Sequence, residues 1–243
     1  MYKRKIYLPS ANGPSDDAMF ARLNYLQAED EVINNGNVAP KTEAEALELA
    51  AISLYAALVD DFTACAADLD AFENPGLLEF VPPKFRESTD RVAEKLVALR
   101  EPLGIAAAEG DEDAQGELIN ALQQKFVDTC ATNSLYGASF FPGHRVTFAE
   151  EHPLMAALPH DVTVAFGHSG MHILDTETYD QIHHFGYADV VRWGGSSSLF
   201  QLFMWNTADE KTIELRLSTA QAADMAGIII DYINAIMAVS EDA

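Results

Sequence analysis

A serine flanked by glycines and histidines stands at residues 167–172, in the segment GHSGMH. Such a serine is the nucleophile of α/β-hydrolases when it occupies a Gly-x-Ser-x-Gly elbow at a sharp strand-to-helix turn. This segment reads Gly-x-Ser-Gly, and strand-length segments stand on both sides of it. The pattern therefore predicts a hairpin turn here and no catalytic serine.

The histidines are the second group with the right chemistry, because all seven lie between residues 144 and 184. Adjacent His183 and His184 point to opposite faces of a strand, so one ion does not easily reach both side chains. His168 and His172 flank a turn and are not two ligands one turn apart on a helix. We therefore expect no metal ligands and no catalytic residues. Of three hypotheses for the function, an esterase or a metal enzyme is the least favoured.

Phosphate-binding and redox motifs are the remaining candidates for chemistry. The sequence has no Walker-type lysine and no Gly-x-Gly-x-x-Gly that opens a helix. Cys65 and Cys130 stand in apolar, helix-like stretches without metal or redox spacing. We interpret both as reduced core thiols and expect no cofactor.

One of the few arginines stands beside a tryptophan in DVVRWGGSSSLFQL, at residues 189–202. The flanks read as strands, and the glycines and serines between them read as a turn. Two interpretations are open. Either Gly194 and its neighbours leave the strand end accessible, so that Arg192 and Trp193 contact a binding partner, or Trp193 packs in the sheet and Arg192 pairs with a local acid such as Asp189.

The charge of the chain excludes several classes of partner. The 243 residues carry a formal net charge of −23, and the one basic cluster is Lys3, Arg4 and Lys5. Nucleic acids and anionic lipids both require clustered Lys and Arg. We therefore expect no nucleic-acid binding and weak or no binding to anionic lipid. Since the sequence has neither a membrane-spanning apolar run nor a signal peptide, we also expect a cytoplasmic protein.

Helical periodicity dominates residues 16–136. Thr42 and Glu45 have the spacing of a capping box before the apolar segment AEALELAAISLYAALV. Pro82 and Pro83 suit the first turn of a further helix. We expect helices over residues 20–33, 42–59, 82–99 and 118–133, with an acidic loop at 106–117.

From Leu135 onward the apolar residues alternate with period two, which predicts strands. Seven segments have strand length: SLYGASFF, DVTVAF, GMHIL, YDQIHHF, ADVVRW, SLFQLFMW and TIELRL. Short connections indicate antiparallel pairing in a sandwich or an open barrel. Ser218 and Gln221 have capping-box spacing before a last amphipathic helix, whose apolar stripe can close the open end of the strands.

Several of these segments together resemble a known family. They are KRKIYLPS, LNYLQAEDEVINNG, EALELAAISLYA, LEFVPPKF, SLYGASFFPG, YADVVRWGGSSSLFQL and AGIIIDYINAIM. In this order they resemble the second (F2) and third (F3) lobes of a FERM domain, above all those of talin and of unconventional myosins with a MyTH4-FERM tail. The resemblance covers nearly the whole chain.

The resemblance implies an α+β fold with three parts. Residues 1–15 would be the end of the first lobe (F1) or a linker, and residues 16–136 would be the helical F2 lobe, an acyl-CoA-binding-like bundle. Residues 137–243 would be the F3 lobe, a PH/PTB-like, seven-stranded antiparallel β-sandwich capped by a C-terminal helix. The F1 lobe is missing from this sequence, so we expect it as a partner within a longer parent chain.

The resemblance also implies a non-catalytic adaptor. Such modules bind the cytoplasmic tail of a membrane receptor, or a cargo peptide, and link membrane proteins to the actin cytoskeleton at the inner face of the plasma membrane. The tail would add a strand to the sheet edge, in the mode called β-augmentation. The implied peptide-binding residues are Val190, Val191, Arg192, Trp193, Gly194, Gly195 and Ser196. The alternative is a cargo-binding or autoinhibitory scaffold lobe of an unconventional myosin tail.

Overall fold

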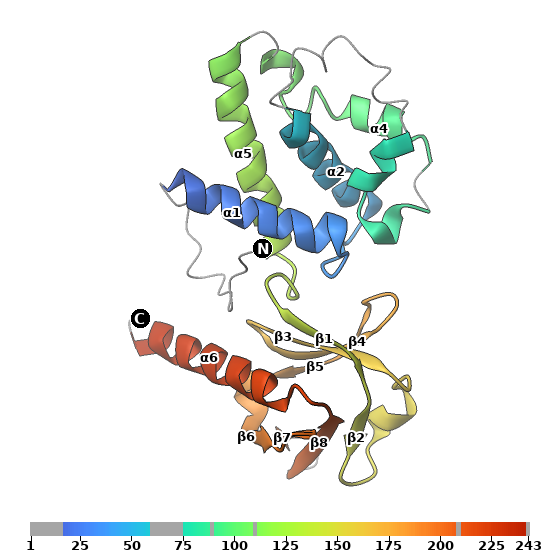
Figure 1. The fold of residues 1–243 in the computed structure, drawn as a ribbon, viewed down its shortest axis with the longest axis vertical. Helices are drawn as coiled ribbons and strands as arrows, with labels where there is room; N and C mark the ends of the chain where they lie inside the picture. Colours follow the sequence, from blue (N-terminus) through green and yellow to red (C-terminus); the bar gives the residue numbers. More distant parts are fainter. Residues whose placement is uncertain (1–16, 59–74, 88–89, 109–110, 208–209, 242–243) are drawn as a thin grey trace. The chain divides into compact units, whose positions relative to one another are not determined.

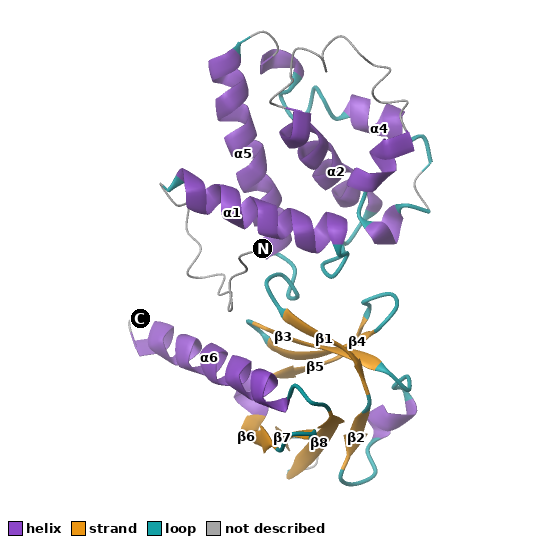
Figure 2. Ribbon diagram, in the orientation of Figure 1, coloured by secondary structure: helices purple, strands orange, loops and turns teal. Residues whose placement is uncertain are grey.

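The structure is a computed structural model that describes residues 17–58, 75–87, 90–108, 111–207 and 210–241 (Figure 1). These residues form two compact units, and the chain passes from the first to the second between Tyr136 and Gly137. Helices make up the first unit, and strands with one long helix make up the second (Figure 2). The α+β class is confirmed, whereas the predicted segment 1–15 lies outside the described residues.

In the helical unit, two of the helices start at a polar side chain that caps the first turn. Its elements are α1 (Ala18–Glu29), the π-helix η2 (Asp30–Asn34), α2 (Glu43–Leu58), η5 (Pro75–Phe80), η6 (Pro83–Phe85), α4 (Val92–Ala98), η7 (Ala106–Ala108) and α5 (Glu112–Ala131). The Asp17 carboxylate accepts from the backbone N–H of Met19 at 2.9 Å. The Thr42 hydroxyl accepts from the N–H of Glu45 at 3.2 Å, as the capping-box spacing predicts.

Aromatic packing and buried polar pairs join the helices of this unit. The rings of Tyr25 on α1 and Phe126 on α5 meet edge to face with centroids 5.4 Å apart. Tyr25 also donates to the Glu29 carboxylate at 2.7 Å, and the hydroxyl of Ser53 on α2 donates to the same carboxylate. Cys130 is buried, as expected, and burial raises the pKa of its thiol, so the thiol stays protonated. Cys65 lies outside the described residues.

Two predicted boundaries in the helical unit are wrong. The helix expected over residues 82–99 is interrupted, because Arg91 has a left-handed backbone (φ 51°) that a right-handed helix cannot include, and α4 starts only at Val92. The segment expected to be an acidic loop is partly helical, because Asp111 caps the N–H of Ala114 at 3.1 Å and α5 begins at Glu112.

The strand unit consists of two four-stranded antiparallel sheets and a helix. Its elements are β1 (Ser139–His144), β2 (Val146–Phe148), η8 (Pro153–Ala156), β3 (Val162–Gly167), β4 (Gly170–Asp175), β5 (Gln181–Gly186), η9 (Tyr187–Asp189), β6 (Val190–Gly195), β7 (Leu199–Asn206), β8 (Lys211–Ser218) and α6 (Ala222–Glu241). The first sheet has the order β1-β3-β4-β5, and the second has the order β2-β8-β7-β6.

The described residues contain eight strands where seven were expected, because the first strand bends from one sheet to the other. β1 pairs with β3 in the first sheet, and β2 pairs with β8 in the second. The register shifts between Phe141 and His144, and Gly143 lies between them with φ 74°, in the left-handed region that favours glycine. The chain therefore bends between Pro142 and Arg145 and passes from β1 in one sheet to β2 in the other. Because proline and glycine are typical of turns, no strand was expected after them.

The core of the strand unit lies between the sheets and under α6. Phe166 on β3 and Phe200 on β7 meet edge to face with centroids 6.0 Å apart, and both side chains are fully buried. Met225, Ile229 and Tyr232 of α6 are buried in the same cluster, as the apolar stripe of that helix predicts. In the turn that leads into α6, the hydroxyl of Thr219 accepts from the N–H of Gln221 at 2.9 Å, so this bond comes from Thr219 and not from the Ser218 of the expected capping box.

Candidate functional site

β6 is an edge strand of the second sheet. Among the described residues, this strand pairs with β7 alone, and α6 packs against both strands. The pairing is interrupted by a register shift between Val190 and Arg192, so the intervening Val191 sits in a β-bulge with 57% of its surface exposed. An edge strand presents backbone donors and acceptors that another strand can use, and a bulge limits where that strand can pair.

The larger side chains among the predicted binding residues lie on two different faces of β6. Val190 and Trp193 are paired with the buried Met204 and Leu202, and both pack partly buried against the core. Arg192 is exposed on the other face, where its guanidinium lies 3.8 Å from the centre of the Phe203 ring. The guanidinium therefore stacks on an aromatic ring.

The small residues at the end of β6 have two different roles. A side chain at Gly195 would collide with the chain, because an ideal Cβ there lies 2.0 Å from the carbonyl oxygen of Leu199. That carbonyl accepts from the N–H of Ser196 at 2.8 Å and closes the hairpin. Gly194, in contrast, has open space where a Cβ would stand. Gly195 and Ser196 thus shape the turn, and Gly194 leaves the outer surface of the strand bare.

The packing of Trp193 gives a testable prediction for the fold. We expect Trp193→Ala to lower the free energy of unfolding of the strand unit by roughly 2 kcal/mol, below the range for a fully buried aromatic, because the ring is only partly buried. Urea unfolding followed by circular dichroism measures this change, and Trp205→Ala, at a 46% exposed position, is the matched control. Equal stability of both variants would show that Trp193 is not a core residue.

A pair of stacked tyrosines fixes the start of the edge strand. Tyr187 in η9, just before β6, stacks on Tyr232 of α6 with ring centroids 5.8 Å apart. Burial raises the pKa of Tyr187, and the neighbouring Tyr232 adds to the shift, so the hydroxyl stays neutral. Sequence reasoning missed this contact. Its only signal was the position of Tyr187 at the start of the strand and of Tyr232 in the apolar stripe of the helix.

The predicted hairpin turn at GHSGMH joins β3 to β4. Ser169 Oγ lies 2.9 Å from His172 Nε2, and Gln181 Oε1 lies 2.7 Å from His172 Nδ1. Because an amide oxygen only accepts, Nδ1 donates to Gln181 and Nε2 accepts from the serine hydroxyl. The order of groups is that of a hydrolase triad, but the imidazole is 1% exposed and reaches no substrate. It ties the hairpin to β5.

Neither a metal-binding cluster nor a membrane-spanning helix is present in the part of the chain that the structure describes. There, no group of three or more His, Cys, Asp and Glu side chains is arranged to hold a metal ion. His172 and His184 lie side by side with ring centroids 4.6 Å apart, and both ring nitrogens of His172 are already bonded, to Ser169 and Gln181. No helix in the same residues is long and apolar enough to cross a membrane.

The chain is similar to known proteins in sequence and in fold. Residues 149–237 match the PTB domain (IRS-1 type) family, designated IRS. The human myosin 7b C-terminal MyTH4-FERM domain, solved in complex with the harmonin-a PDZ3 domain, aligns with 96% of this chain at 15% identity and a TM-score of 0.65. A Dictyostelium discoideum myosin VII MyTH4-FERM domain (MF2, mutant 1) aligns with 95% at 15% identity and a TM-score of 0.64. The fold is that of FERM lobes F2 and F3.

A third structure extends the FERM likeness beyond the myosins. The FERM and C-terminal domain complex of Drosophila Merlin aligns with 99% of this chain at 11% identity and a TM-score of 0.60, over 72% of its own length. The chain spans 42% of the length of each of the two myosin chains. No curated protein sequence matches it significantly. The edge strand β6 and most of helix α6 lie within the residues that match the PTB domain family.

Proposed function

We propose that this chain, whose fold is similar to that of FERM lobes, is a non-catalytic adaptor that binds the cytoplasmic tail of a membrane receptor, or a cargo peptide, at the edge of β6. The observation that carries the proposal is the position of β6 at the end of the second sheet, beside α6. A tail peptide that adds a strand there gains main-chain hydrogen bonds from the edge and side-chain contacts from its surroundings. We further propose that residues 137–243 are the F3 lobe and residues 16–136 the F2 lobe.

The bulge defines which part of β6 the peptide uses. Regular pairing of β6 with β7 covers Arg192 to Gly195, whereas Val191 stands outside the ladder. A peptide strand therefore pairs with the backbone of residues 192–195, and the exposed Val191 side chain offers an apolar contact at the end of that stretch. Gly194 keeps the middle of the stretch free of side-chain atoms.

A second function is favoured by the kind of structures that the chain resembles. Two of the similar solved chains are MyTH4-FERM domains of myosin VII proteins, and one of them was solved with a PDZ domain bound. The alternative proposal is therefore a cargo-binding or autoinhibitory scaffold lobe of an unconventional myosin tail. In both proposals the F1 lobe of a longer parent chain is an additional partner, and the protein acts in the cytoplasm, at the actin cytoskeleton or the inner face of the plasma membrane.

The proposal predicts which substitution removes peptide binding without unfolding the protein. We expect Val191→Asp to weaken binding of an Asn-Pro-x-Tyr tail peptide about fivefold, or about 1 kcal/mol, because it replaces an exposed apolar contact by a charge. An amide-shift titration measures the affinity and shows which backbone amides respond. Shifts concentrated in β6 and the facing part of α6 are the expected result.

The matched control is Met155→Asp, because Met155 is also exposed, at 44%, and lies in η8 of the same unit. It should leave the affinity unchanged. Silence of the β6 amides in a folded protein would contradict the tail-binding proposal. Competition of the parent's own F1 lobe or motor for the same edge would then favour the myosin-tail alternative.

A further inference from the structure

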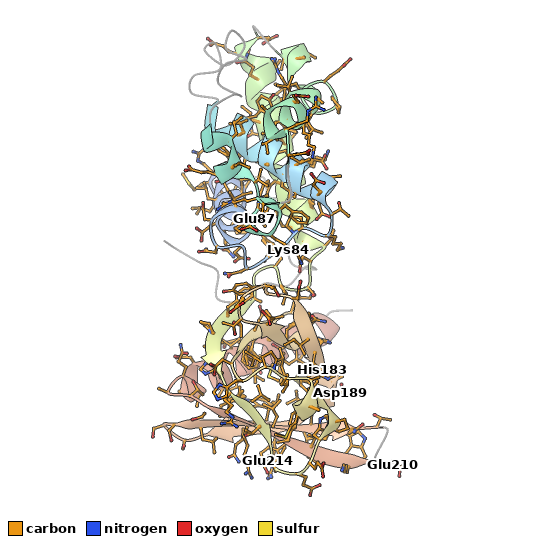
Figure 3. The ribbon with its side chains drawn as sticks, turned by 90° about the vertical axis from the view of Figure 1, so that its right-hand side faces the viewer. Lys84, Glu87, His183, Asp189, Glu210 and Glu214 are labelled. Atoms are coloured by element: carbon orange, nitrogen blue, oxygen red, sulfur yellow. The ribbon has the colours of Figure 1, made fainter. Side chains whose placement is uncertain are left out.

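The turn that ends the π-helix η2 contains three asparagines in the segment NNGN, at residues 34–37. Asn35 is exposed, and Gly36 follows it with a left-handed backbone (φ 67°). A side chain at position 36 would crowd the short helix η6, because an ideal Cβ there lies 3.0 Å from Pro83 Cγ (the next residue, Lys84, is labelled in Figure 3). The fold therefore places a glycine directly after an exposed asparagine.

An asparagine that precedes a glycine can lose its side-chain amide without an enzyme, and asparagine is a thermolabile residue for this reason. The backbone nitrogen of the glycine attacks the asparagine Cγ, the new C–N bond closes a five-membered succinimide, and the Cγ–Nδ2 bond breaks. The leaving nitrogen takes the proton of the attacking nitrogen and departs as ammonia. Water then opens the ring: its hydroxyl adds to one of the two ring carbonyls, and its proton returns to the glycine nitrogen. The product is an aspartate, or an isoaspartate in which the chain runs through the side-chain carbon.

The nitrogen that would attack Asn35 is free in the folded chain. It belongs to Gly36, whose N–H makes no hydrogen bond to any residue that the structure describes. Gly36 also has no Cβ that could hinder the approach of its nitrogen to the Asn35 Cγ. The attacking group at this pair is thus both available and unhindered.

The two other asparagines of the turn lack such an attacking group. Asn34 is followed by the N–H of Asn35, which donates to the Asp30 carbonyl at 2.9 Å. Asn37 is followed by the β-branched Val38, whose N–H donates to a backbone carbonyl of η2 at 3.3 Å. Both nitrogens are engaged and stand beside a side chain. Asn34 and Asn37 are therefore internal references for Asn35.

The amide of Asn35 is bound to a carboxylate. Its Nδ2 donates to Asp30 Oδ2 at 2.9 Å, and Asn34 Nδ2 donates to Asp30 Oδ1 at 3.3 Å. Loss of the Asn35 amide removes one of these donors and puts a second carboxylate in its place. The new anion also stands at the C-terminal end of a helix, where the helix dipole disfavours negative charge. Deamidation thus turns an attraction into a repulsion.

Contacts on both sides of the turn hold the helical unit together. The Ile33 carbonyl, just before the turn, accepts from Arg86 Nη2 at 3.0 Å. Val38, just after Asn37, is 2% exposed, and the carbonyl of the next residue accepts from Asn133 Nδ2 of α5 at 3.0 Å. A turn that opens at position 35 therefore disturbs packing on either side of it.

We propose that Asn35 is a site of spontaneous deamidation, and that its aspartate and isoaspartate products loosen the connection between η2 and α2. The hydrogen bond to Asp30 delays the reaction, because the amide must leave that carboxylate before its Cγ turns to the Gly36 nitrogen. The isoaspartate adds one carbon to the backbone inside a short connection. This modification site lies in the helical unit and is independent of the peptide site on β6.

Peptide mapping by mass spectrometry tests the site on the full chain, incubated at pH 8 and 37 °C, with fragment spectra that assign each mass gain to one residue. We expect Asn35 to deamidate about tenfold faster than Asn34 and Asn37, with both aspartate and isoaspartate among the products. Asp30→Asn should speed the reaction about threefold, because the amide is then held less firmly. Asn35→Gln should abolish the mass gain at this position, since a glutamine would have to close a six-membered ring. Asn12, which also precedes a glycine, lies outside the described residues and is measured in its own peptide.

The effect of the product is measured by urea unfolding of the helical unit, followed by circular dichroism. We expect Asn35→Asp to raise the equilibrium constant for unfolding about tenfold, because it adds a like-charge contact and an anion at a helix end. The matched control Asn37→Asp adds the same charge to the same turn and should change the constant by less than about twofold. In an Asp30→Asn background, the effect of Asn35→Asp should be about threefold smaller, because the like-charge contact is gone.

Three results would overturn the proposal: an Asn35 amide that stays intact throughout the incubation, deamidation of Asn34 or Asn37 as fast as that of Asn35, or equal stability of Asn35→Asp and Asn37→Asp. An unchanged rate in Asp30→Asn would refute the restraining role of that carboxylate. None of these results depends on peptide binding at β6, so the adaptor proposal stands or falls separately.

Discussion

Replacing Gly195 by alanine should lower the free energy of unfolding of the strand unit by roughly 3 kcal/mol, because the new Cβ has no space. An ideal Cβ at this position lies 2.0 Å from the carbonyl oxygen of Leu199 and 3.0 Å from the Cα of Phe200. Both atoms belong to the backbone of β7, which cannot rotate away as a flexible side chain does. The hairpin must open, and the hydrogen bond from Ser196 to Leu199 is lost with it.

The adjacent glycine is the control, because nothing lies within 4 Å of an ideal Cβ at Gly194. We expect Gly194→Ala to change the free energy of unfolding by less than about 0.5 kcal/mol. Urea unfolding followed by tryptophan fluorescence suits both variants, since the only two tryptophans of the chain, Trp193 and Trp205, lie on β6 and β7. Equal losses in the two variants would show that the hairpin does not have the geometry described here.

The two glycines illustrate what the sequence could and could not reveal about the site. The composition of DVVRWGGSSSLFQL predicts a strand, a turn and a strand, and the structure has β6, a turn and β7 there. Residue types do not reveal which glycine is confined by the backbone of the next strand, because that depends on pairing register. For the same reason, the sequence left open whether Trp193 faces the core or a ligand; in the structure it packs against the core.

The fold class and the order of the elements were easier to predict from the sequence than the residues at which the elements begin and end. Local periodicity predicts α6 and β8, since each buries one regular face. The bend at Gly143 and the left-handed Arg91 escaped prediction, because both are single-residue backbone conformations that tertiary contacts select. Arg192, Phe203 and Glu214 form a row across β6, β7 and β8 that is also a product of register, and no spacing along the chain indicates it.

Acidification should destabilise the strand unit, because His172 is held neutral inside it. Burial is the main cause that lowers the pKa of His172; the hydrogen bond to Gln181 opposes it, the nearby His184 and His168 add to it, and the net result is a shift from 6.5 to about 4. The unfolded chain takes up this proton near pH 6.5, whereas the folded chain resists it until about pH 4. The stabilisation is therefore fully present above pH 6.5 and is lost as the pH falls from 6.5 towards 4.

The expected loss follows from the size of the shift. One pKa unit corresponds to about 1.4 kcal/mol, so the full shift of His172 is worth roughly 3 kcal/mol. The pKa values of His168 and His183 are also lowered, chiefly by burial, so their contributions have the same sign. Protonation of the many carboxylates over the same range reduces the repulsion within a chain of net charge −23, which acts in the opposite direction.

A comparison of variants separates the histidine from the carboxylates. We expect the free energy of unfolding, followed by tryptophan fluorescence between pH 7.5 and 4.5, to depend less steeply on pH in His172→Gln than in wild type. The control is His160→Gln, since His160 is exposed and pairs only with the neighbouring Asp161 among the contacts described, at 2.9 Å. Its pH dependence should equal that of wild type. Parallel curves for wild type and His172→Gln would show that the buried imidazole is not the acid-sensitive group, because all three proteins share the same carboxylates.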